Sequence, residues 1–189
     1  LLSLFSLLSA VFAEEPSAPL APVSVTVGTV PTGLHIEVDS DTYTSPHIFN
    51  WLPTSGHTLG APSPQSGGAG IQYLFDFWSN SGEQYQTIFI PYSPATYTAT
   101  FATQHDLATP INISGGRVIP DCTLGCWYDS GTSLNLLAVA GSGYVFDHWS
   151  GDCAGTNPSV GVTMTGPKTC TVNFASCLDT LPVMLVSTG

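Results

Sequence analysis

The stretch Tyr73-Leu74-Phe75-Asp76-Phe77-Trp78-Ser79 recurs later in the chain as Tyr144-Val145-Phe146-Asp147-His148-Trp149-Ser150. Tyr, Phe, Asp, Trp and Ser occupy the same places in both copies, which lie 144 − 73 = 71 residues apart. Each copy is followed by a second similar stretch, at residues 97–102 and 169–175. Matched pairs of this kind are typical of tandem structural repeats. They predict two modules, at about residues 23–104 and 105–176.

Both modules are expected to consist of β-strands. Apolar and polar side chains alternate over residues 23–27 and 34–39, and strand-like runs follow at residues 87–90, 133–139 and 160–164. A period of two is typical of half-buried strands, and no segment has a convincing helical period. The fold class is therefore predicted to be all-β, with two small tandem modules of β-sandwich or β-grasp-like form and without a helix.

Composition supports a folded protein and excludes some classes of partner. The chain has 189 residues, with two Lys plus Arg against thirteen Asp plus Glu, and a formal net charge of -11. Charged residues make up 8% of the chain and hydrophobic residues 43%, a balance unlike that of a disordered acidic tail. Phosphate backbones and anionic membrane surfaces attract proteins through cations, which are nearly absent. We therefore expect no nucleic-acid partner.

The N-terminal segment indicates export. Residues 1–13 form an apolar run that ends in Val11-Phe12-Ala13, which predicts a signal peptide that has lost its start and is cleaved after Ala13. This run is shorter than the roughly 18 residues that span a bilayer, so no membrane span is expected. Residues 14–22 are predicted to be a Pro-rich linker, and residues 177–189 the truncated start of a following segment. The expected location is secreted or at the cell surface.

The second module carries a family signature. It contains Gly116-Arg117-Val118-Ile119-Pro120, then Trp127-Tyr128-Asp129-Ser130-Gly131-Thr132, then the run Gly143-Tyr144-Val145-Phe146-Asp147-His148-Trp149-Ser150-Gly151-Asp152. In these residues it resembles the divergent internalin B-repeat family of bacterial extracellular proteins, also called Listeria-Bacteroides repeats. The first module looks like a relative found upstream of such repeats, but it lacks the Gly-Asp pair after Ser79. The resemblance implies a β-rich spacer or adhesion unit without catalytic residues.

The second module also holds the candidate covalent bonds. Cys122, Cys126, Cys153 and Cys170 are expected to form disulfides in an exported protein. Four cysteines allow three pairings; we favour Cys122 with Cys126 and Cys153 with Cys170. A zinc site is the alternative, but the Cys-x-x-x-Cys spacing has no second matching pair. Cys177 is left over, with a partner expected beyond residue 189.

No catalytic, metal-binding or cofactor-binding residues are predicted. Asp76 and Asp147 belong to separate modules, whereas paired carboxylates act within about 5 to 10 Å. Calcium needs six to eight oxygens, and Asp147 and Asp152 do not lie in a spaced acidic loop. The five His residues are scattered, and no nucleophile elbow such as Gly-x-Ser-x-Gly is present.

Exposed aromatic side chains are the remaining candidates for ligand binding. Trp127 and Tyr128 are predicted as residues on which a sugar ring could stack, with Tyr85 and Tyr92 as further candidates. The favoured function is a non-catalytic spacer or adhesion unit of a larger secreted or surface protein. The alternative is a carbohydrate-binding module attached to a secreted hydrolase. Expected partners are other domains of the same chain, a polysaccharide or a host matrix protein.

Overall fold

The computed structural model describes residues 19–177. The predicted signal peptide and the segment from residue 178 onward lie outside the described residues, as does part of the predicted linker. Every helix or strand assigned within the described range is a β-strand, which confirms the all-β prediction. Among these residues, accordingly, there is no helix with the length and apolar character to cross a membrane.

The first module contains two sheets. Its strands are β1 (Val23–Val30), β2 (His35–Val38), β3 (Asp41–Thr44), β4 (His47–Trp51), β5 (Gly56–Gly60), β6 (Gln65–Ser66), β7 (Ile71–Trp78), β8 (Tyr85–Phe89) and β9 (Ala95–Ala108). One sheet runs β4-β1-β9-β7-β6 and the other β3-β2-β5-β8. Strand β1 is parallel to β9, whereas β7 is antiparallel to β9.

The second module repeats this arrangement. Its own strands are β10 (Gly116–Ile119), β11 (Cys126–Asp129), β12 (Ser133–Ala140), β13 (Tyr144–Gly151), β14 (Ser159–Thr163) and β15 (Lys168–Ser176). The order β11-β9-β15-β13 matches β4-β1-β9-β7 of the first module, including the one parallel pair. The antiparallel sheet β10-β12-β14 corresponds to β2-β5-β8. The two modules thus share one topology.

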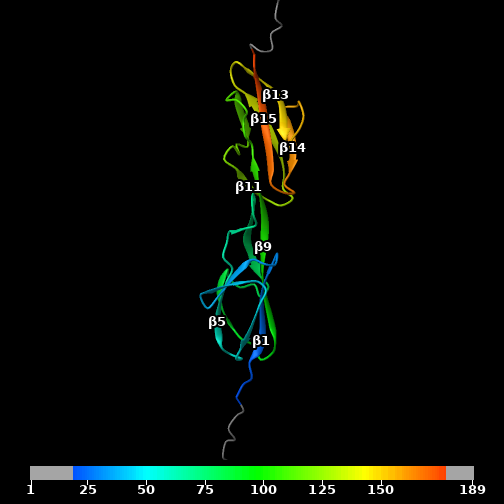
Figure 1. The fold of residues 1–189 in the computed structure, drawn as a ribbon. Coiled ribbons are helices and arrows are strands. Elements are labelled where there is room, and N and C mark those ends of the chain that lie inside the picture. Colours follow the sequence, from blue (N-terminus) through cyan, green and yellow to red (C-terminus); the bar gives the residue numbers. More distant parts are fainter. Residues whose placement is uncertain (1–18, 178–189) are drawn as a thin grey trace, which may run out of the picture.

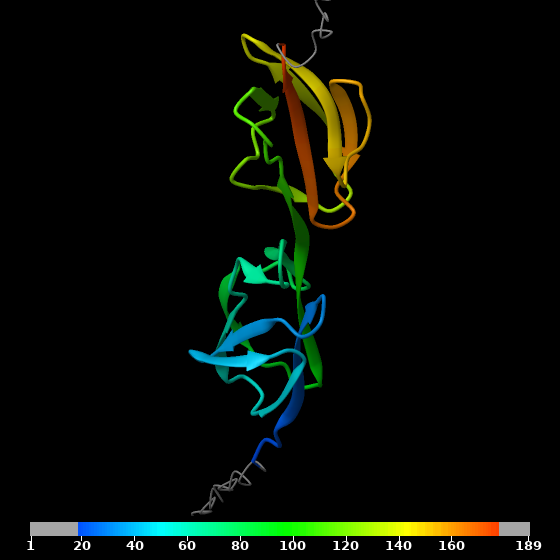
Figure 2. The same ribbon diagram turned by 45° about the horizontal axis from the view of Figure 1, so that its top comes forward.

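Strand β9 belongs to both modules. It is the last strand of the first module, where it pairs with β1 and β7. It then continues without interruption and becomes the first strand of the second module, where it pairs with β11 and β15. Figures 1 and 2 show the two modules end to end along this strand, with the described ends of the chain at opposite extremes. The boundary predicted between residues 104 and 105 falls inside β9.

The repeated sequence motif has the same backbone irregularity in both modules. It forms β7 and β13, and the pairing register shifts once in each strand, between Phe75 and Phe77 and between Phe146 and His148. The extra residue is Asp76 in the first module and Asp147 in the second. A β-bulge leaves one residue outside the ladder and redirects the side chains that follow it. The recurrence of these two acids therefore coincides with a structural feature of the strand.

The tryptophan that follows each bulge turns into the core. Trp78 is 1% exposed and Trp149 is 2% exposed. Each indole N–H donates to a carbonyl in the following loop, from Trp78 to Gln84 O at 3.2 Å and from Trp149 to Asn157 O at 3.1 Å. A buried indole needs such an acceptor, because an unpaired buried donor is costly.

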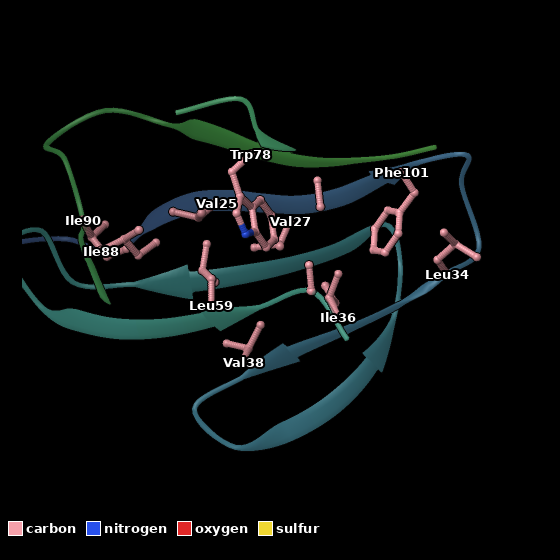
Figure 3. Packing of buried hydrophobic residues seen from close by; sticks show 12 residues of the cluster. Val25, Val27, Leu34, Ile36, Val38, Leu59, Trp78, Ile88, Ile90 and Phe101 are labelled. Carbon is pink, nitrogen blue, oxygen red and sulfur yellow. The ribbon is translucent and has the colours of Figure 1, made fainter. Parts of the chain in front are cut away.

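Each module has its own hydrophobic core. The first core lies between its two sheets (Figure 3) and consists of Val25, Val27, Leu34, Ile36, Val38, Leu59, Ala61, Trp78, Ile88, Ile90, Ala99 and Phe101. The second consists of Leu107, Val118, Cys122, Leu136, Ala138, Trp149, Cys153, Val162, Met164, Cys170, Val172 and Phe174. These two sets have no residue in common, although β9 contributes to both of them.

Candidate functional site

The second module contains two disulfides. They join Cys122 to Cys126 and Cys153 to Cys170, the same pairs that sequence analysis favoured. The second bond joins the segment just after β13 to β15, across the connection that contains β14. Because these sulfurs are bonded to each other, they are not available to zinc. In the part of the chain that the structure describes, no group of three or more His, Cys, Asp or Glu residues is arranged to hold a metal.

The two predicted stacking residues differ in their surroundings. Trp127 is 43% exposed and lines a hollow of about 340 Å³ together with Pro64, Gln65 and Ile71 of the first module. Tyr128 is only partly exposed and packs against the second core. Trp127 is thus available for stacking at the junction of the modules, whereas much of Tyr128 is already covered.

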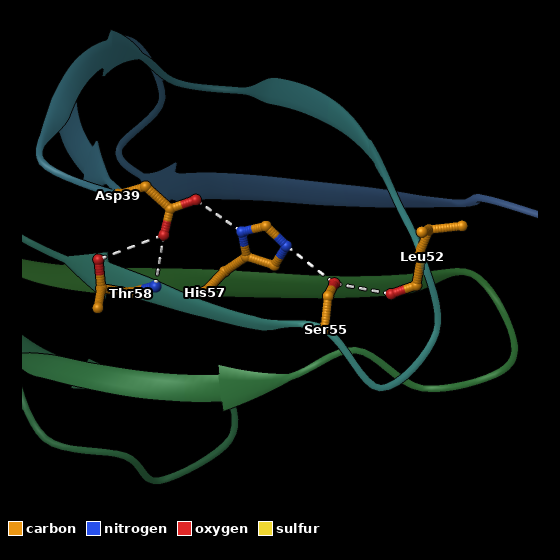
Figure 4. Close-up of polar contacts among 5 residues, drawn as sticks. All are labelled: Asp39, Leu52, Ser55, His57 and Thr58. Carbon is orange, nitrogen blue, oxygen red and sulfur yellow. Dashed lines mark hydrogen bonds and ion pairs between the residues drawn. The ribbon is translucent and has the colours of Figure 1, made fainter.

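The structure brings together a third group that sequence analysis did not identify. His57 lies between Asp39 and Ser55, as Figure 4 shows. Its Nδ1 is 2.6 Å from Asp39 Oδ2, and its Nε2 is 2.9 Å from Ser55 Oγ. An aspartate, a histidine and a serine joined in this order are the connected groups of a hydrolase triad. The arrangement therefore has to be tested against that chemistry.

The turn between β2 and β3 positions the carboxylate of Asp39. Asp39 and Ser40 both have positive φ values, of 50° and 76°. Two such residues in succession form the tight turn that suits a two-residue β-hairpin. The turn holds Asp39 beside β5, where its Oδ1 accepts the Thr58 N–H at 2.8 Å. Local turn chemistry thus positions Asp39 next to His57.

Hydrogen-bond counting argues against a nucleophilic Ser55. Its hydroxyl lies 2.7 Å from Leu52 O as well as 2.9 Å from His57 Nε2, and one hydroxyl hydrogen can serve only one of these acceptors. Leu52 O therefore competes with the imidazole for the hydrogen that a nucleophilic serine would have to transfer.

The backbone around Ser55 also lacks free donors for an oxyanion. Ser55 N–H donates to Leu52 O and Thr54 N–H donates to Ile90 O. The ring of Trp51 covers one face of His57, with the ring centres 4.0 Å apart and the planes 14° from parallel. A reacting carbonyl would need both access and such donors. We interpret this group as a structural tie between the β2–β3 turn and β5.

The environment of Asp39 lowers its pKa. Desolvation alone would raise the pKa of this carboxyl, but hydrogen bonds from His57 and from Thr58 N–H outweigh it and hold the pKa below 3.8. A carboxyl with a lowered folded-state pKa stabilises the fold above its unfolded-state pKa. That stabilisation is lost as the pH falls through the lowered value. The side chain is 47% exposed, so solvent screening keeps the effect modest.

Replacement of Asp39 by Asn is therefore expected to flatten the acid limb of the stability curve. The wild-type melting temperature should fall more steeply than that of D39N below about pH 4, because only the wild type has this carboxyl to protonate. Thermal denaturation of both proteins from neutral to acidic pH measures the difference. Asp41→Asn, on the same hairpin, is the matched control. If the melting temperatures of wild type and D39N fell in parallel with pH, the proposed stabilising contact between Asp39 and His57 would be contradicted.

The separation of the three residues explains why the sequence does not reveal them. Asp39 is eighteen positions from His57, and the contact depends on the hairpin turn and on the position of β5. Ser55 is near His57 in sequence, but the string Ser55-Gly56-His57 does not by itself specify a contact between the two side chains. The β2–β3 turn contains no Gly or Asn that would have marked it as a tight turn.

These features describe a class of protein: two small β-modules of one topology, linked in tandem, with two disulfides in the second module. Residues 109–177 match the family model described as Divergent InlB B-repeat domain. The match confirms the resemblance predicted for the second module. The match covers 69 of the 189 residues and does not include the first module.

Other comparisons add little. Comparison with curated proteins gives no match. Among solved structures, the major pilin protein T-13 of Streptococcus pyogenes aligns over 84% of this chain and 97% of its own, at 10% sequence identity. The TM-score of that alignment is 0.24, too low to support an argument about fold or function.

Proposed function

We propose that this chain is a non-catalytic, rigid spacer or adhesion unit within a larger secreted or cell-surface protein. The observation that carries the proposal is the shared strand β9, which enters the sheets of both modules without a linker. The pairing of β9 with β7 overlaps its pairing with β11 at Gln104 and His105, so bending at the junction would break ladder hydrogen bonds. The modules are therefore held at a fixed separation.

Side chains reinforce the junction. Gln72 Nε2 donates to Gln104 Oε1 at 2.9 Å, and Gln104 Nε2 donates to Asp129 Oδ1 at 2.8 Å. Ser130 N–H also donates to Thr103 O at 2.8 Å. These bonds connect β7 of the first module through β9 to the end of β11 in the second. The divergent InlB B-repeat match supports an extracellular setting, in which the partners would include other domains of the same chain.

Small-angle X-ray scattering of residues 14–189 tests the rigidity. A compact protein of about 160 residues would have a radius of gyration of about 15 Å, and the end-to-end arrangement should exceed this value. Insertion of a short Gly-Ser segment between Thr103 and Gln104 should broaden the distance distribution. The same insertion after Gly82, in a loop of the first module, is the control. A compact wild-type particle, or equal flexibility in all three proteins, would contradict the proposal.

A carbohydrate-binding role is the second candidate. It is favoured by Trp127, which remains 43% exposed beside Pro64, Gln65 and Ile71 in the hollow at the junction. An exposed indole that presents one face to solvent suits stacking against the apolar face of a sugar. Pull-down on insoluble polysaccharides, with Trp127→Ala as the comparison, tests this role separately from the spacer function.

A further inference from the structure

The outer face of the sheet β3-β2-β5-β8 carries a second hollow, of about 370 Å³. It lies on the first module and involves neither Trp127 nor the junction. Hydroxyl, amide and carboxylate groups surround one aromatic ring in it; the lining includes Glu37, Ser40, Thr58, Gln86, Thr87 and Tyr85. Such a lining can donate and accept many hydrogen bonds beside one apolar surface.

Two aromatic rings of β8 lie over glycines of β5. Tyr85 pairs with Gly60, and a Cβ added to Gly60 would lie 2.6 Å from two carbons of the tyrosine ring. Phe89 pairs with Gly56, where an added Cβ would lie 3.4 Å from the phenyl ring. Because Gly60 and Gly56 have no side chains, the rings of Tyr85 and Phe89 can lie directly over the backbone of β5. Even so, Tyr85 is 56% exposed and Phe89 is 73% exposed.

The two rings are spaced along one face of the same strand. Side chains alternate across a strand, so Tyr85, Thr87 and Phe89 share the outer face, with Thr58 opposite Thr87. The two aromatic positions are four residues apart along the strand, a distance of about 13 Å. This spacing exceeds the width of a single sugar ring and leaves hydroxyl groups between the two platforms. The face therefore suits an extended ligand with repeating units.

We propose that this surface, defined by Tyr85, Phe89, Thr58, Thr87 and Glu37, binds a neutral oligosaccharide. Each pyranose ring has an apolar face of C–H groups that matches the electron-rich face of an aromatic ring. Its hydroxyl groups match the threonines and the Glu37 carboxylate. Among the lining residues there is a carboxylate and no cation, which disfavours an anionic polysaccharide. The inference is independent of the spacer role and of the Trp127 surface.

Affinity electrophoresis of residues 14–189 through gels that contain neutral glucans, xylan or mannan tests the proposal, with pull-down on cellulose and chitin. At least one neutral polysaccharide is expected to bind. Tyr85→Ala and Phe89→Ala should each weaken that binding on the order of tenfold. Gly60→Ala should weaken it as well, because the new Cβ displaces the tyrosine ring while keeping it in the protein.

Matched controls separate this surface from others. Phe77→Ala removes an aromatic ring that is 51% exposed on β7, in the other sheet of the first module, and it should bind like the wild type. Unchanged melting temperatures would show that the variants are folded. Absence of binding to every neutral polysaccharide, or capture by matrix proteins alone, would overturn the proposal. So would binding that survives Y85A and F89A but is lost in W127A, which would assign it to the junction.

Discussion

Trp78→Ala is expected to lower the free energy of unfolding of the first module by about 3–5 kcal/mol. Trp78 is 1% exposed and packs within the first core, so its removal leaves a large cavity between two sheets. It also leaves Gln84 O without its indole donor. Single domains are stable by only about 5–15 kcal/mol, so W78A should be partly unfolded at moderate temperature.

The second module should be much less affected by this substitution, because the two cores have no residue in common. Hydrogen exchange of peptides from β7 and β8, compared with peptides from β13 and β15, separates the two responses. Trp149→Ala should produce the reverse pattern. Trp127→Ala, at a half-exposed site, should have a far smaller effect on either module. Equal loss of protection in both modules would mean that β9 couples them into one folding unit.

The equivalence of Trp78 and Trp149 was predictable from the sequence. Aromatic residues repeated at one offset predicted two similar modules, and the pattern of alternating residues located strands such as β1, β2 and β12. The bulges at Asp76 and Asp147 were not predicted, because a bulge depends on the partner strand and not on the strand alone. The sequence therefore indicated that these acids recur without indicating why.

The shared strand was also not predicted. Its inward-facing positions are Ala99, Phe101, Thr103, His105 and Leu107. The alternation of apolar and polar residues is therefore interrupted at the junction, where a threonine and a histidine take inward-facing positions. These residues lie in a polar stretch of the sequence that is typical of a linker. Only the pairing of β9 with strands of both modules makes the stretch a strand. A tertiary contact thus overrides the local composition.

The candidate binding surface depends on register in the same way. Sequence analysis named Tyr85 as a stacking candidate but omitted Phe89. Strands β5 and β8 are separated by twenty-four residues of loops and other strands, and their pairing alone places each aromatic ring over a glycine. A shift of one residue would turn both rings toward the opposite face. No pattern within either strand specifies that register.

The double substitution Cys153→Ala with Cys170→Ala is expected to destabilise the second module by about 3 kcal/mol, the chain-entropy value for a loop of this size. The cysteines are separated by 17 positions, and in the unfolded chain the bond closes the segment that connects β13 to β15. Both side chains are buried, at 3% and 0% exposed, so lost packing adds to the effect. The first module contains no cysteine and should keep its stability.

The matched control is Cys122→Ala with Cys126→Ala. These residues are only 4 positions apart, and the shorter loop predicts a smaller loss, about 2 kcal/mol. Urea denaturation with hydrogen exchange as the readout compares the wild type and both variants, with Cys177 retained throughout. A larger loss in C122A/C126A would mean that the Cys122–Cys126 turn, and not the tie between β13 and β15, limits unfolding. Equal stability in all three proteins would mean that β9 and the aromatic core stabilise the second module without the disulfides. The physical reason would be that this module takes its first strand from its neighbour, so part of its sheet is already formed when it folds.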